Sequence, residues 1–230
     1  MLLLFDIDGT LIRCGGAGRR ALDQAFSICF GIEGALDRVR LDGSTDPRIV
    51  EDAFRLAFGR APEPREVERV LERYLVRLED ELSRAADSYQ VLAGVRELMS
   101  IVTRADRFVV GLATGNVERG ARLKLARGGL NAFFELGGFG SDAADRAELV
   151  RHGIERGQRR AEVRFGRRFA PEEIWVFGDT AADVVAARAA GAVAVGVLHG
   201  SGVRDELTGA KPDVMLESLA DPALLARIGG

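Results

Sequence analysis

LLLFDIDGTL, residues 2–11, joins four apolar residues to a turn that contains two carboxylates. A run that is apolar at every position is typical of a parallel strand covered on both faces, and open α/β sheets bind ligands beyond the carboxyl ends of such strands. Asp6 and Asp8 stand at that end, and residues two apart in an extended chain point the same way. The stretch therefore predicts two carboxylates facing one crevice. A surface turn, the alternative, explains the polarity of these residues but not their position.

The composition limits the class of protein. With 230 residues, 47% of them hydrophobic, the chain is long enough for one large domain or for a core with a smaller domain. A formal net charge of -3, from 32 basic and 35 acidic residues, gives no electrostatic reason to expect nucleic acid or an anionic membrane as a partner. Cys14 and Cys29 form neither a closely spaced metal-ligand pair nor a disulfide framework. The opening run is too short for a signal peptide or a membrane span, so we expect a cytoplasmic protein.

Apolar runs alternate with helical segments along much of the chain, which is the pattern of βα units on a parallel sheet. Further strands are predicted at residues 108–113, 174–177 and 193–197, with weaker runs at 134–139 and 213–216. Two of these runs lead into polar turns, Thr114-Gly115-Asn116 and Gly178-Asp179-Thr180, each followed by a helical stretch. We therefore expect the polar ends of three strands to meet at one edge of the sheet.

Residues 19–86 have helical periodicity without a convincing strand. Helices are predicted from residue 20, over residues 47–58 and over residues 66–86. The last has apolar positions near the 3.6-residue period: Val67, Val70, Leu71, Tyr74, Leu75, Leu78 and Leu82. Turn-prone linkers flank the segment at residues 15–18 and 88–94. This organisation predicts a core of residues 1–14 and 92–230 and a helical cap of residues 15–91, the alternative being a fixed decoration of the core.

Three motifs resemble those of the haloacid dehalogenase-like hydrolase superfamily: DIDGTL at residues 6–11, Thr114 at a strand end, and GDTAAD at residues 178–183. With a helical insertion after the first motif, the chain is similar to the phosphoglycolate phosphatase and β-phosphoglucomutase branch. The resemblance covers nearly the whole chain. It implies an α/β fold with a Rossmann-like parallel sheet of about five strands, in the order 5-4-1-2-3, and an inserted helical cap domain over the active site.

The carboxylates at the first strand end have distinct expected roles. Asp6 can attack phosphorus in line and form an aspartyl-phosphate, the role that the resemblance implies for it. Asp8 can protonate the leaving alkoxide and later take a proton from the hydrolytic water. The resemblance implies Mg²⁺, held by the Asp6 carboxylate, the Asp8 carbonyl and Asp179, with Asp183 behind these ligands or bound directly on occasion. For Asp179 the alternative role is a helix cap.

The phosphate group needs donors and a cation. Thr114 is expected to offer its hydroxyl to the transferring phosphoryl group, and Gly115 and Asn116 their backbone N–H groups, although an N-cap explains the same pattern. The resemblance implies a cation that holds nucleophile and phosphate together. Lys124 is favoured because the chain keeps a lysine there while having only two lysines among many arginines. Arg146 is the alternative cation.

Substrate specificity is expected in the insertion and its linkers, because the core reads only phosphate and metal. The candidate residues are Gly15, Gly16, Arg19, Arg20, Thr45 and Asp46. Arg19 or Arg20 can pair with a carboxylate or a second phosphate of the substrate, but surface arginines at a helix start need no function. Thr45 and Asp46 precede a proline and are also typical of a helix N-terminus.

The residues together predict a Mg²⁺-dependent phosphatase that hydrolyses a small phosphorylated metabolite, with 2-phosphoglycolate suggested by the resemblance. A hexose-phosphate mutase keeps both acids of the first motif and is the nearest enzymatic alternative. A phosphate-accepting or ligand-binding module is the non-enzymatic alternative, and it is disfavoured because every acid that the mechanism requires is present. We expect a monomer or a homodimer.

Overall fold

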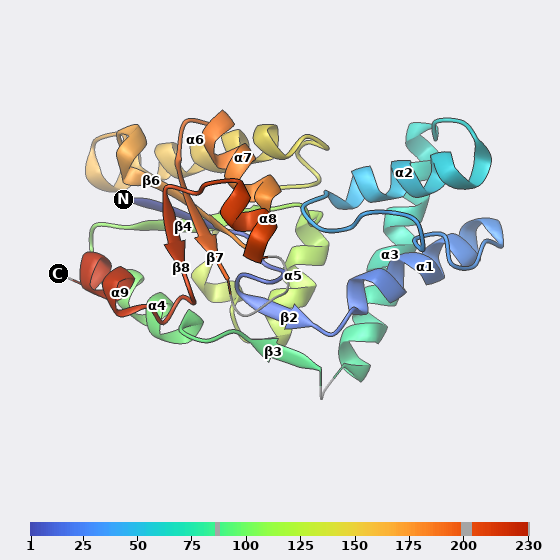
Figure 1. Cartoon of the computed structure of the whole chain (residues 1–230), viewed down its shortest axis with the longest axis horizontal. Coiled ribbons are helices and arrows are strands. Elements are labelled where there is room, and N and C mark those ends of the chain that lie inside the picture. Colours follow the sequence, from blue (N-terminus) through green and yellow to red (C-terminus); the bar gives the residue numbers. More distant parts are fainter. Residues whose placement is uncertain (86–87, 199–203, 230) are drawn as a thin grey trace.

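The structure is a computed structural model that describes residues 1–85, 88–198 and 204–229. Its main sheet has six parallel strands: β1 (Leu2–Phe5), β4 (Val109–Thr114), β5 (Leu136–Phe139), β6 (Ile174–Gly178), β7 (Val193–Val197) and β8 (Val214–Leu216). In space they follow the order β5-β4-β1-β6-β7-β8, with β1 near the centre (Figure 1). The α/β class predicted from the sequence is confirmed.

The strand order differs in detail from the expected 5-4-1-2-3. Counted by their succession along the chain, the strands of this sheet lie in the order 3-2-1-4-5-6. The first five follow the expected order when it is read from the opposite edge. The difference is the sixth strand, β8, which arises from the weak apolar run at residues 213–216 and pairs with β7 at the edge.

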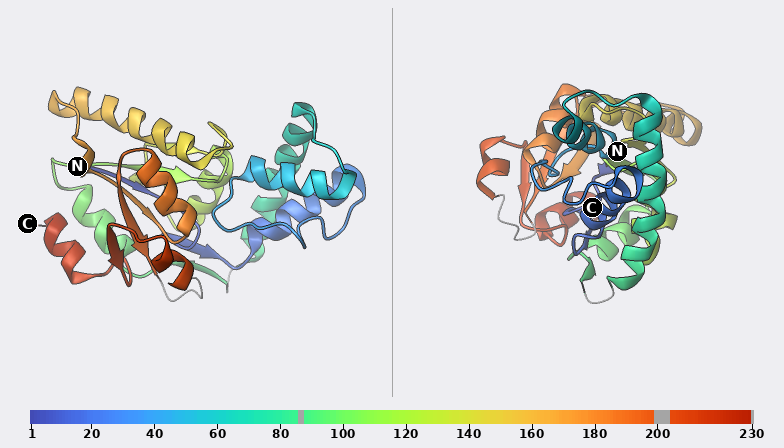
Figure 2. Two further views of the ribbon diagram at one scale, coloured as in Figure 1. Left: turned by 45° about the horizontal axis from the view of Figure 1, so that its top comes forward. Right: turned by 90° about the vertical axis from the view of Figure 1, so that its right-hand side faces the viewer.

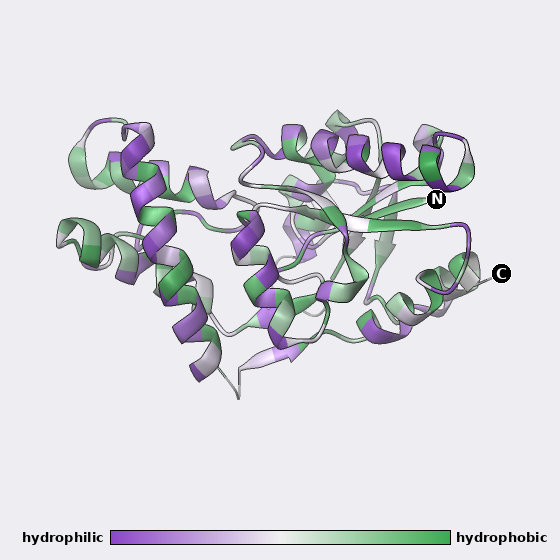
Figure 3. Ribbon diagram, turned by 180° about the vertical axis from the view of Figure 1, so that it is seen from behind, coloured by the Kyte–Doolittle hydropathy of each residue, from purple (hydrophilic) through white to green (hydrophobic). Residues whose placement is uncertain are grey.

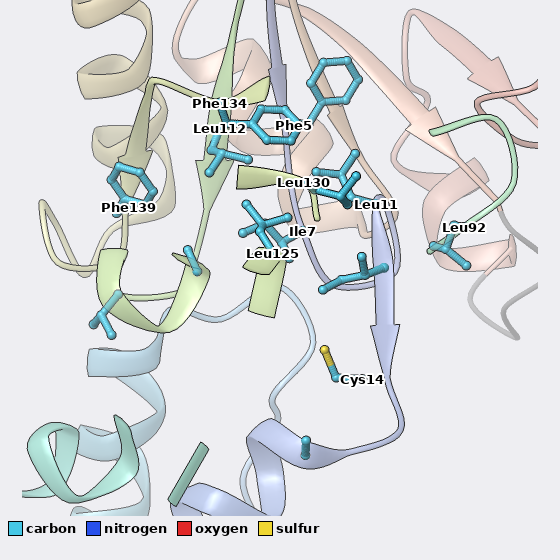
Figure 4. Close-up of a cluster of buried hydrophobic side chains, with 14 of the residues drawn as sticks. Phe5, Ile7, Leu11, Cys14, Leu92, Leu112, Leu125, Leu130, Phe134 and Phe139 are labelled. Carbon is cyan, nitrogen blue, oxygen red and sulfur yellow. The ribbon is translucent and has the colours of Figure 1, made fainter. Parts of the chain in front are cut away.

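The central strand is buried on both faces because side chains of alternate residues enter two separate apolar clusters. Leu3 and Phe5 pack with α4 (Val95–Val102), α5 (Glu118–Arg127) and α9 (Pro222–Gly229). Leu2 and Leu4 pack with α6 (Arg146–Phe165), α7 (Ala181–Ala189) and α8 (Arg204–Gly209). Figure 4 shows part of the first cluster around Phe5. This double burial explains why the strand is apolar at every position.

Short 3-10 turns, η1 (Asn131–Phe133) and η2 (Pro171–Glu173), precede β5 and β6. Figure 3 shows the strands of the sheet as largely hydrophobic, whereas the helices carry both hydrophobic and hydrophilic residues. None of the helices in the described parts of the chain is long and apolar enough to pass through a bilayer.

Three helices form the insertion: α1 (Ala17–Phe30), α2 (Asp46–Phe58) and α3 (Pro64–Arg84). They pack together at one end of the molecule, beyond the carboxyl ends of the strands (Figures 1 and 2). The three predicted helices are confirmed. α3 starts two residues earlier than expected, because Pro64 occupies its first turn and Glu63 forms a capping box with Glu66. Ala86, the predicted end of this helix, lies outside the described residues.

The linkers to the insertion contain a pair of strands that the sequence analysis did not predict. β2 (Ile12–Cys14) and β3 (Tyr89–Val91) are antiparallel, with Cys14 opposite Tyr89. Each strand has only three residues, which is too short for alternation of apolar and polar residues to be recognised. The chain therefore leaves and re-enters the sheet region along one hydrogen-bonded ribbon.

The contact between β5 and α6 depends on glycine. A Cβ at Gly138 would overlap the carbonyl group of Leu149 in α6. We predict that Gly138→Ala lowers the free energy of unfolding by about 2–4 kcal/mol, because two well-packed backbones must separate. Gly209→Ala is the matched control, since no atom lies within 4 Å of its added Cβ. Urea denaturation followed by circular dichroism measures both variants, and equal stabilities would contradict the close packing.

Candidate active site

The carboxyl ends of β1, β4 and β6 lie side by side, because β1 pairs in parallel with both neighbours. Asp6 directly follows β1, Thr114 is the last residue of β4, and Asp179 directly follows β6. The backbone N–H of Asp6 donates to the carbonyl of Phe177 at 2.8 Å and so continues the pairing beyond the strand. The predicted meeting of three strand ends is confirmed by this topology.

The turn after β1 is shaped around Asp179. Gly9 has a φ of +79°, and a Cβ there would overlap the Asp179 carboxylate. Its N–H donates to the carbonyl of Ile12 at 2.9 Å, which closes the turn. The hydroxyl of Thr10 donates to Asp179 Oδ1 at 3.4 Å. Glycine is required at position 9 both for the backbone conformation and for the approach of the acid.

Three carboxylates gather at this edge of the sheet. Oxygens of Asp6, Asp179 and Asp183 all lie within 4.8 Å of one another. Burial raises the pKa of Asp6 to about 7, although Arg146 opposes the rise. Burial and repulsion from Asp183 and Asp6 raise the pKa of Asp179 to about 8. Carboxylate oxygens at this spacing are the donors that Mg²⁺ prefers, and a divalent cation would relieve their repulsion, so the residues fit the expected metal.

Arg146, the first residue of α6, supplies positive charge to this cluster. Its Nε and Nη2 donate to Asp183 Oδ1 at 2.9 and 2.6 Å, and Nη2 lies 3.1 Å from Asp6 Oδ2. Burial alone would lower the pKa of Arg146, but Asp183 and Asp6 raise it well above its ordinary value. The other oxygen of Asp183 accepts from the hydroxyl and the N–H of Thr180 at 2.7 and 3.0 Å. Both oxygens of Asp183 therefore already have donors.

Lys124, in α5, pairs with a different carboxylate. Its Nζ donates to Asp8 Oδ2 and to Asn116 Oδ1, both at 2.6 Å, and Asn116 Nδ2 donates to the same Asp8 oxygen at 2.9 Å. Burial would raise the pKa of Asp8, but the charge of Lys124 and these hydrogen bonds hold it below its ordinary value. The structure thus brings both predicted cations into the site, and only Arg146 contacts Asp6. Which of them binds phosphate stays a prediction.

The turn after β4 is built around the Thr114 hydroxyl. Asn116 donates to it from its backbone N–H at 3.3 Å and from Nδ2 at 2.8 Å. Both of these bonds are ones that the hydroxyl accepts, which leaves its proton available as a donor. Thr114 itself is fully buried, so its predicted contact with a phosphoryl group stays a prediction.

A cavity of about 560 Å³ lies between these strand ends and the inserted helices. From the core, the predicted residues that line it are Asp6, Asp8, Gly115, Asn116, Lys124, Arg146 and Asp179. From the insertion and its linker, the predicted residues that line it are Gly15, Gly16, Arg19 and Asp46. The loop before α2 packs closely against the core at the cavity wall, because a Cβ at Gly115 would overlap the carbonyl of Ser44.

Two predicted substrate residues do not line this cavity. Nε of Arg20 donates to Glu81 Oε2 at 2.7 Å, an ion pair within the insertion. The hydroxyl of Thr45 donates to the carbonyl of Ala144 at 3.0 Å and accepts from the N–H of Arg48, as an N-cap of α2 does. The ordinary structural explanation accounts for both of these residues.

Asp46 is the acidic residue that the insertion places against the core. Its N–H donates to the carbonyl of Gly115 at 2.8 Å, and its Oδ2 accepts from the N–H of Val117 at 2.9 Å. Only 6% of the residue is exposed. Burial raises the pKa of Asp46 to about 6, although Lys124 and the hydrogen bond from Val117 lower it. An ionisable group is therefore kept at the cavity wall at an electrostatic cost.

A model of the haloacid dehalogenase-like hydrolases matches residues 1–191. The chain belongs to this hydrolase family.

This haloacid dehalogenase-like hydrolase is similar in sequence to a phosphatase and in fold to several solved structures. A phosphoglycolate phosphatase of Synechococcus elongatus is 26% identical over 149 residues, a match that spans 65% of this chain and 65% of the relative's length. A hydrolase structure from Pseudomonas syringae shares the fold with a TM-score of 0.71, at 23% identity and with 99% of both chains covered. CbbY from Rhodobacter sphaeroides, solved with phosphate, gives 0.70 at 18% identity, covering 99% and 98% of the two chains.

Sequence reasoning missed several residues of the cavity wall in this haloacid dehalogenase-like hydrolase, and Tyr74 is the buried phenol among them. Tyr74 of α3 lines the cavity. Its place in the apolar stripe of the helix predicted a core residue, and the residue is indeed only 1% exposed. A phenol in an apolar stripe could have been noticed, because buried tyrosine hydroxyls normally have a hydrogen-bond partner.

The raised pKa of Asp46 predicts a pH-dependent effect of Asp46→Asn on stability. An acid whose pKa is higher in the folded state than in the unfolded state favours folding less as pH rises between the two values. The contribution of Asp46 to wild-type stability should therefore fall between about pH 4 and 6, and the asparagine variant should lack this part of the fall. We expect the variant to be more stable by about 1–3 kcal/mol at pH 7 and equal near pH 4, as measured by urea denaturation. A difference in free energy of unfolding between the two proteins that stays constant across this range would show that folding does not raise the pKa of Asp46.

Proposed function

We propose that this chain is a Mg²⁺-dependent phosphatase that hydrolyses a phosphomonoester of a small metabolite through an aspartyl-phosphate on Asp6. The observation that carries the proposal is the setting of Asp6. It stands at the end of the central strand, within the carboxylate cluster, and 3.1 Å from the guanidinium of Arg146. A nucleophile beside a metal site and a buried cation is the arrangement that phosphoryl transfer requires.

In the first step, a carboxylate oxygen of Asp6 attacks phosphorus, and the bond from phosphorus to the ester oxygen breaks. Asp8 donates a proton to the departing alkoxide, which leaves as an alcohol. Lys124 and Asn116 bind only Oδ2 of Asp8, while 44% of its side chain is exposed to the cavity side. The two neighbours therefore orient Asp8 without covering it.

In the second step, water attacks phosphorus of the aspartyl-phosphate, and the bond from phosphorus to the Asp6 oxygen breaks. The Asp8 carboxylate takes a proton from this water, so inorganic phosphate and free Asp6 are formed. Lys124 favours the ionised form of Asp8, which is the form that accepts this proton. The proton taken from water here is the one that Asp8 donates to the alkoxide in the first step of the next turnover. One side chain thus serves both halves of the reaction.

The proposal assigns the remaining groups as follows. Asp6, Asp179 and the Asp8 carbonyl would hold Mg²⁺, with Asp183 behind them, and bound Mg²⁺ would neutralise phosphate charge. Arg146 and Lys124 would bind phosphoryl oxygens, and Gly115 would offer its N–H. Residues 15–91 would act as the cap over a core of residues 1–14 and 92–230. 2-Phosphoglycolate is the first ester to test, because a relative bears that name.

Replacement of the nucleophile tests the proposal directly. Asp6→Asn should lower the release of inorganic phosphate from p-nitrophenyl phosphate by at least about a thousandfold, because an amide is not a nucleophile for phosphorus. Chelation of Mg²⁺ by EDTA should abolish wild-type release, and added Mg²⁺ should restore it. Asp106→Asn is the control, since Asp106 forms an exposed ion pair with Arg164. Activity that persists in Asp6→Asn, or a lack of activity with every phosphate ester, would refute the phosphatase proposal.

The contact of Arg146 with Asp6 makes a second prediction. Arg146→Lys keeps the charge but cannot reach Asp183 with two nitrogens and Asp6 at the same time. We expect kcat/KM for p-nitrophenyl phosphate to fall by about 10–100-fold, with weaker competitive inhibition by inorganic phosphate. Arg156→Lys is the control, because Arg156 is on the same helix as Arg146 but does not line the cavity. Its ion pair is with Asp142, which precedes that helix. An unchanged inhibition constant for phosphate would leave Lys124 as the phosphate-binding cation.

A further inference from the structure

Two buried polar side chains of the insertion line the cavity without a full set of partners. Asp46 is 6% exposed and Tyr74 is 1% exposed. Among the described residues, the Asp46 side chain accepts one hydrogen bond, from Val117 to Oδ2, and the Tyr74 hydroxyl has none. Because both side chains line the cavity, their free hydrogen-bonding positions are open to a ligand there.

The Tyr74 hydroxyl and Lys124 both lie near Gly18 of α1. A Cβ built on Gly18 would lie 3.5 Å from Lys124 Nζ and 3.9 Å from the Tyr74 hydroxyl. The charges of Asp46 and Lys124 both act on the pKa of Tyr74, and Asp46 also acts on Lys124. The cavity beside Gly18 is therefore bordered by a phenol hydroxyl and an ammonium, and the Asp46 carboxylate lines the same cavity.

In the proposed reaction, the phosphoryl group of the bound ester lies at the strand ends beside Asp6. The leaving group of that ester then extends into the cavity toward α1, α2 and α3. Apolar side chains of the insertion, Leu22, Leu41 and Ile49, also line the cavity and can contact a carbon chain. Asp46 and Tyr74 are then the polar groups that read what that chain carries.

The charges around this cavity discriminate among leaving groups. A carboxylate would be repelled by Asp46. Of the four basic side chains that line the described part of the cavity, Lys124 and Arg146 bind the phosphoryl group in the proposed reaction, Arg19 pairs with Asp37, and Arg13 also has a partner. An ammonium would meet Lys124. A hydroxyl can donate to Asp46 and accept from Tyr74 without either repulsion.

We propose that Asp46 and Tyr74 select phosphomonoesters whose leaving group carries a free hydroxyl, as phosphorylated polyols and sugars do, over esters with a carboxylate such as 2-phosphoglycolate. This inference rests on the proposed phosphatase function and adds the class of substrate to it. It assigns specificity to two residues of the insertion and leaves the chemistry at Asp6 unchanged.

A series of two-carbon esters tests the selection in the wild-type protein. The esters are 2-hydroxyethyl phosphate, ethyl phosphate, phosphoethanolamine and 2-phosphoglycolate, which differ only in the group at the far end. We expect kcat/KM for 2-hydroxyethyl phosphate to exceed that for each of the others by about tenfold or more, because a lost hydrogen bond or an unpaired buried charge disfavours the others. A value for 2-phosphoglycolate equal to or above that for 2-hydroxyethyl phosphate would overturn the inference.

Variants assign the selection to the two residues. Asp46→Asn keeps an acceptor for Val117 but removes the charge, so the ratio of kcat/KM for 2-hydroxyethyl phosphate to that for 2-phosphoglycolate should fall at least about tenfold. Tyr74→Phe should lower the ratio of kcat/KM for 2-hydroxyethyl phosphate to that for ethyl phosphate by at least about threefold, because the ligand hydroxyl keeps only its bond to Asp46. Asp52→Asn is the matched control on α2, because Asp52 pairs on the surface with Arg48 and Arg55.

The outcomes separate the inference from the function beneath it. Ratios that stay at wild-type values in Asp46→Asn or in Tyr74→Phe overturn the assignment of specificity, while turnover of p-nitrophenyl phosphate keeps the phosphatase proposal intact. No turnover of any ester, p-nitrophenyl phosphate included, overturns the phosphatase proposal and the inference together.

Discussion

Repulsion among buried carboxylates is the constraint around which this molecule is organised. Asp6, Asp179 and Asp183 are brought within 4.8 Å by two adjacent strand ends and one helix start, where little water is available to screen them. Arg146 offsets part of this repulsion by contacting Asp6 and Asp183. The remaining negative charge would favour a divalent cation, as the proposed Mg²⁺ site requires, so the fold holds an electrostatically unfavourable cluster in place.

The stability needed to hold such a cluster comes from the apolar sheet beneath it. Leu2 to Phe5 have no exposed surface, and Phe5 stacks on Phe177 of the next strand with ring centroids 4.4 Å apart. This close packing fixes the backbone positions of the residues that directly follow these strands, Asp6 and Asp179. Glycines then permit the close approaches that bring the acids together, as Gly9 does against Asp179. The apolar packing thus lies along the strands, and the charged groups lie just beyond their carboxyl ends.

The sequence predicted features that a local pattern determines. The apolar run at residues 2–5, the acidic turn and the polar residues after two other strands placed Asp6, Thr114 and Asp179 at one edge of the sheet. Pairings between distant segments had no such signal. Nothing near Lys124 indicated that it would bind Asp8 rather than Asp6, and nothing near Arg146 indicated its contact with Asp6. Which carboxylate each cation contacts depends on the positions of α5 and α6 relative to the strands. The packing of the whole core determines those positions.

Similar reasoning explains the errors in the description of the insertion and its linkers. Tyr74 matched an apolar stripe because periodicity records which face of a helix is buried and not what covers that face. β2 and β3 were missed because three-residue strands have no periodicity, and only their mutual pairing makes them strands. In both cases the deciding information lies in a partner segment rather than in the residues themselves.

The β2–β3 ribbon has a consequence for how this architecture can diversify. Because Cys14 and Tyr89 are opposite each other, the two ends of the inserted segment are already joined at the spacing of neighbouring strands. The ribbon therefore offsets part of the entropy of closing that loop, a cost that grows only slowly with the length of the chain between its ends. A segment of different size or fold could therefore be joined to the sheet at the same two positions. Recombination there would exchange the cavity wall that α1 to α3 supply and keep Asp6, Asp8 and Asp179, which belong to the core.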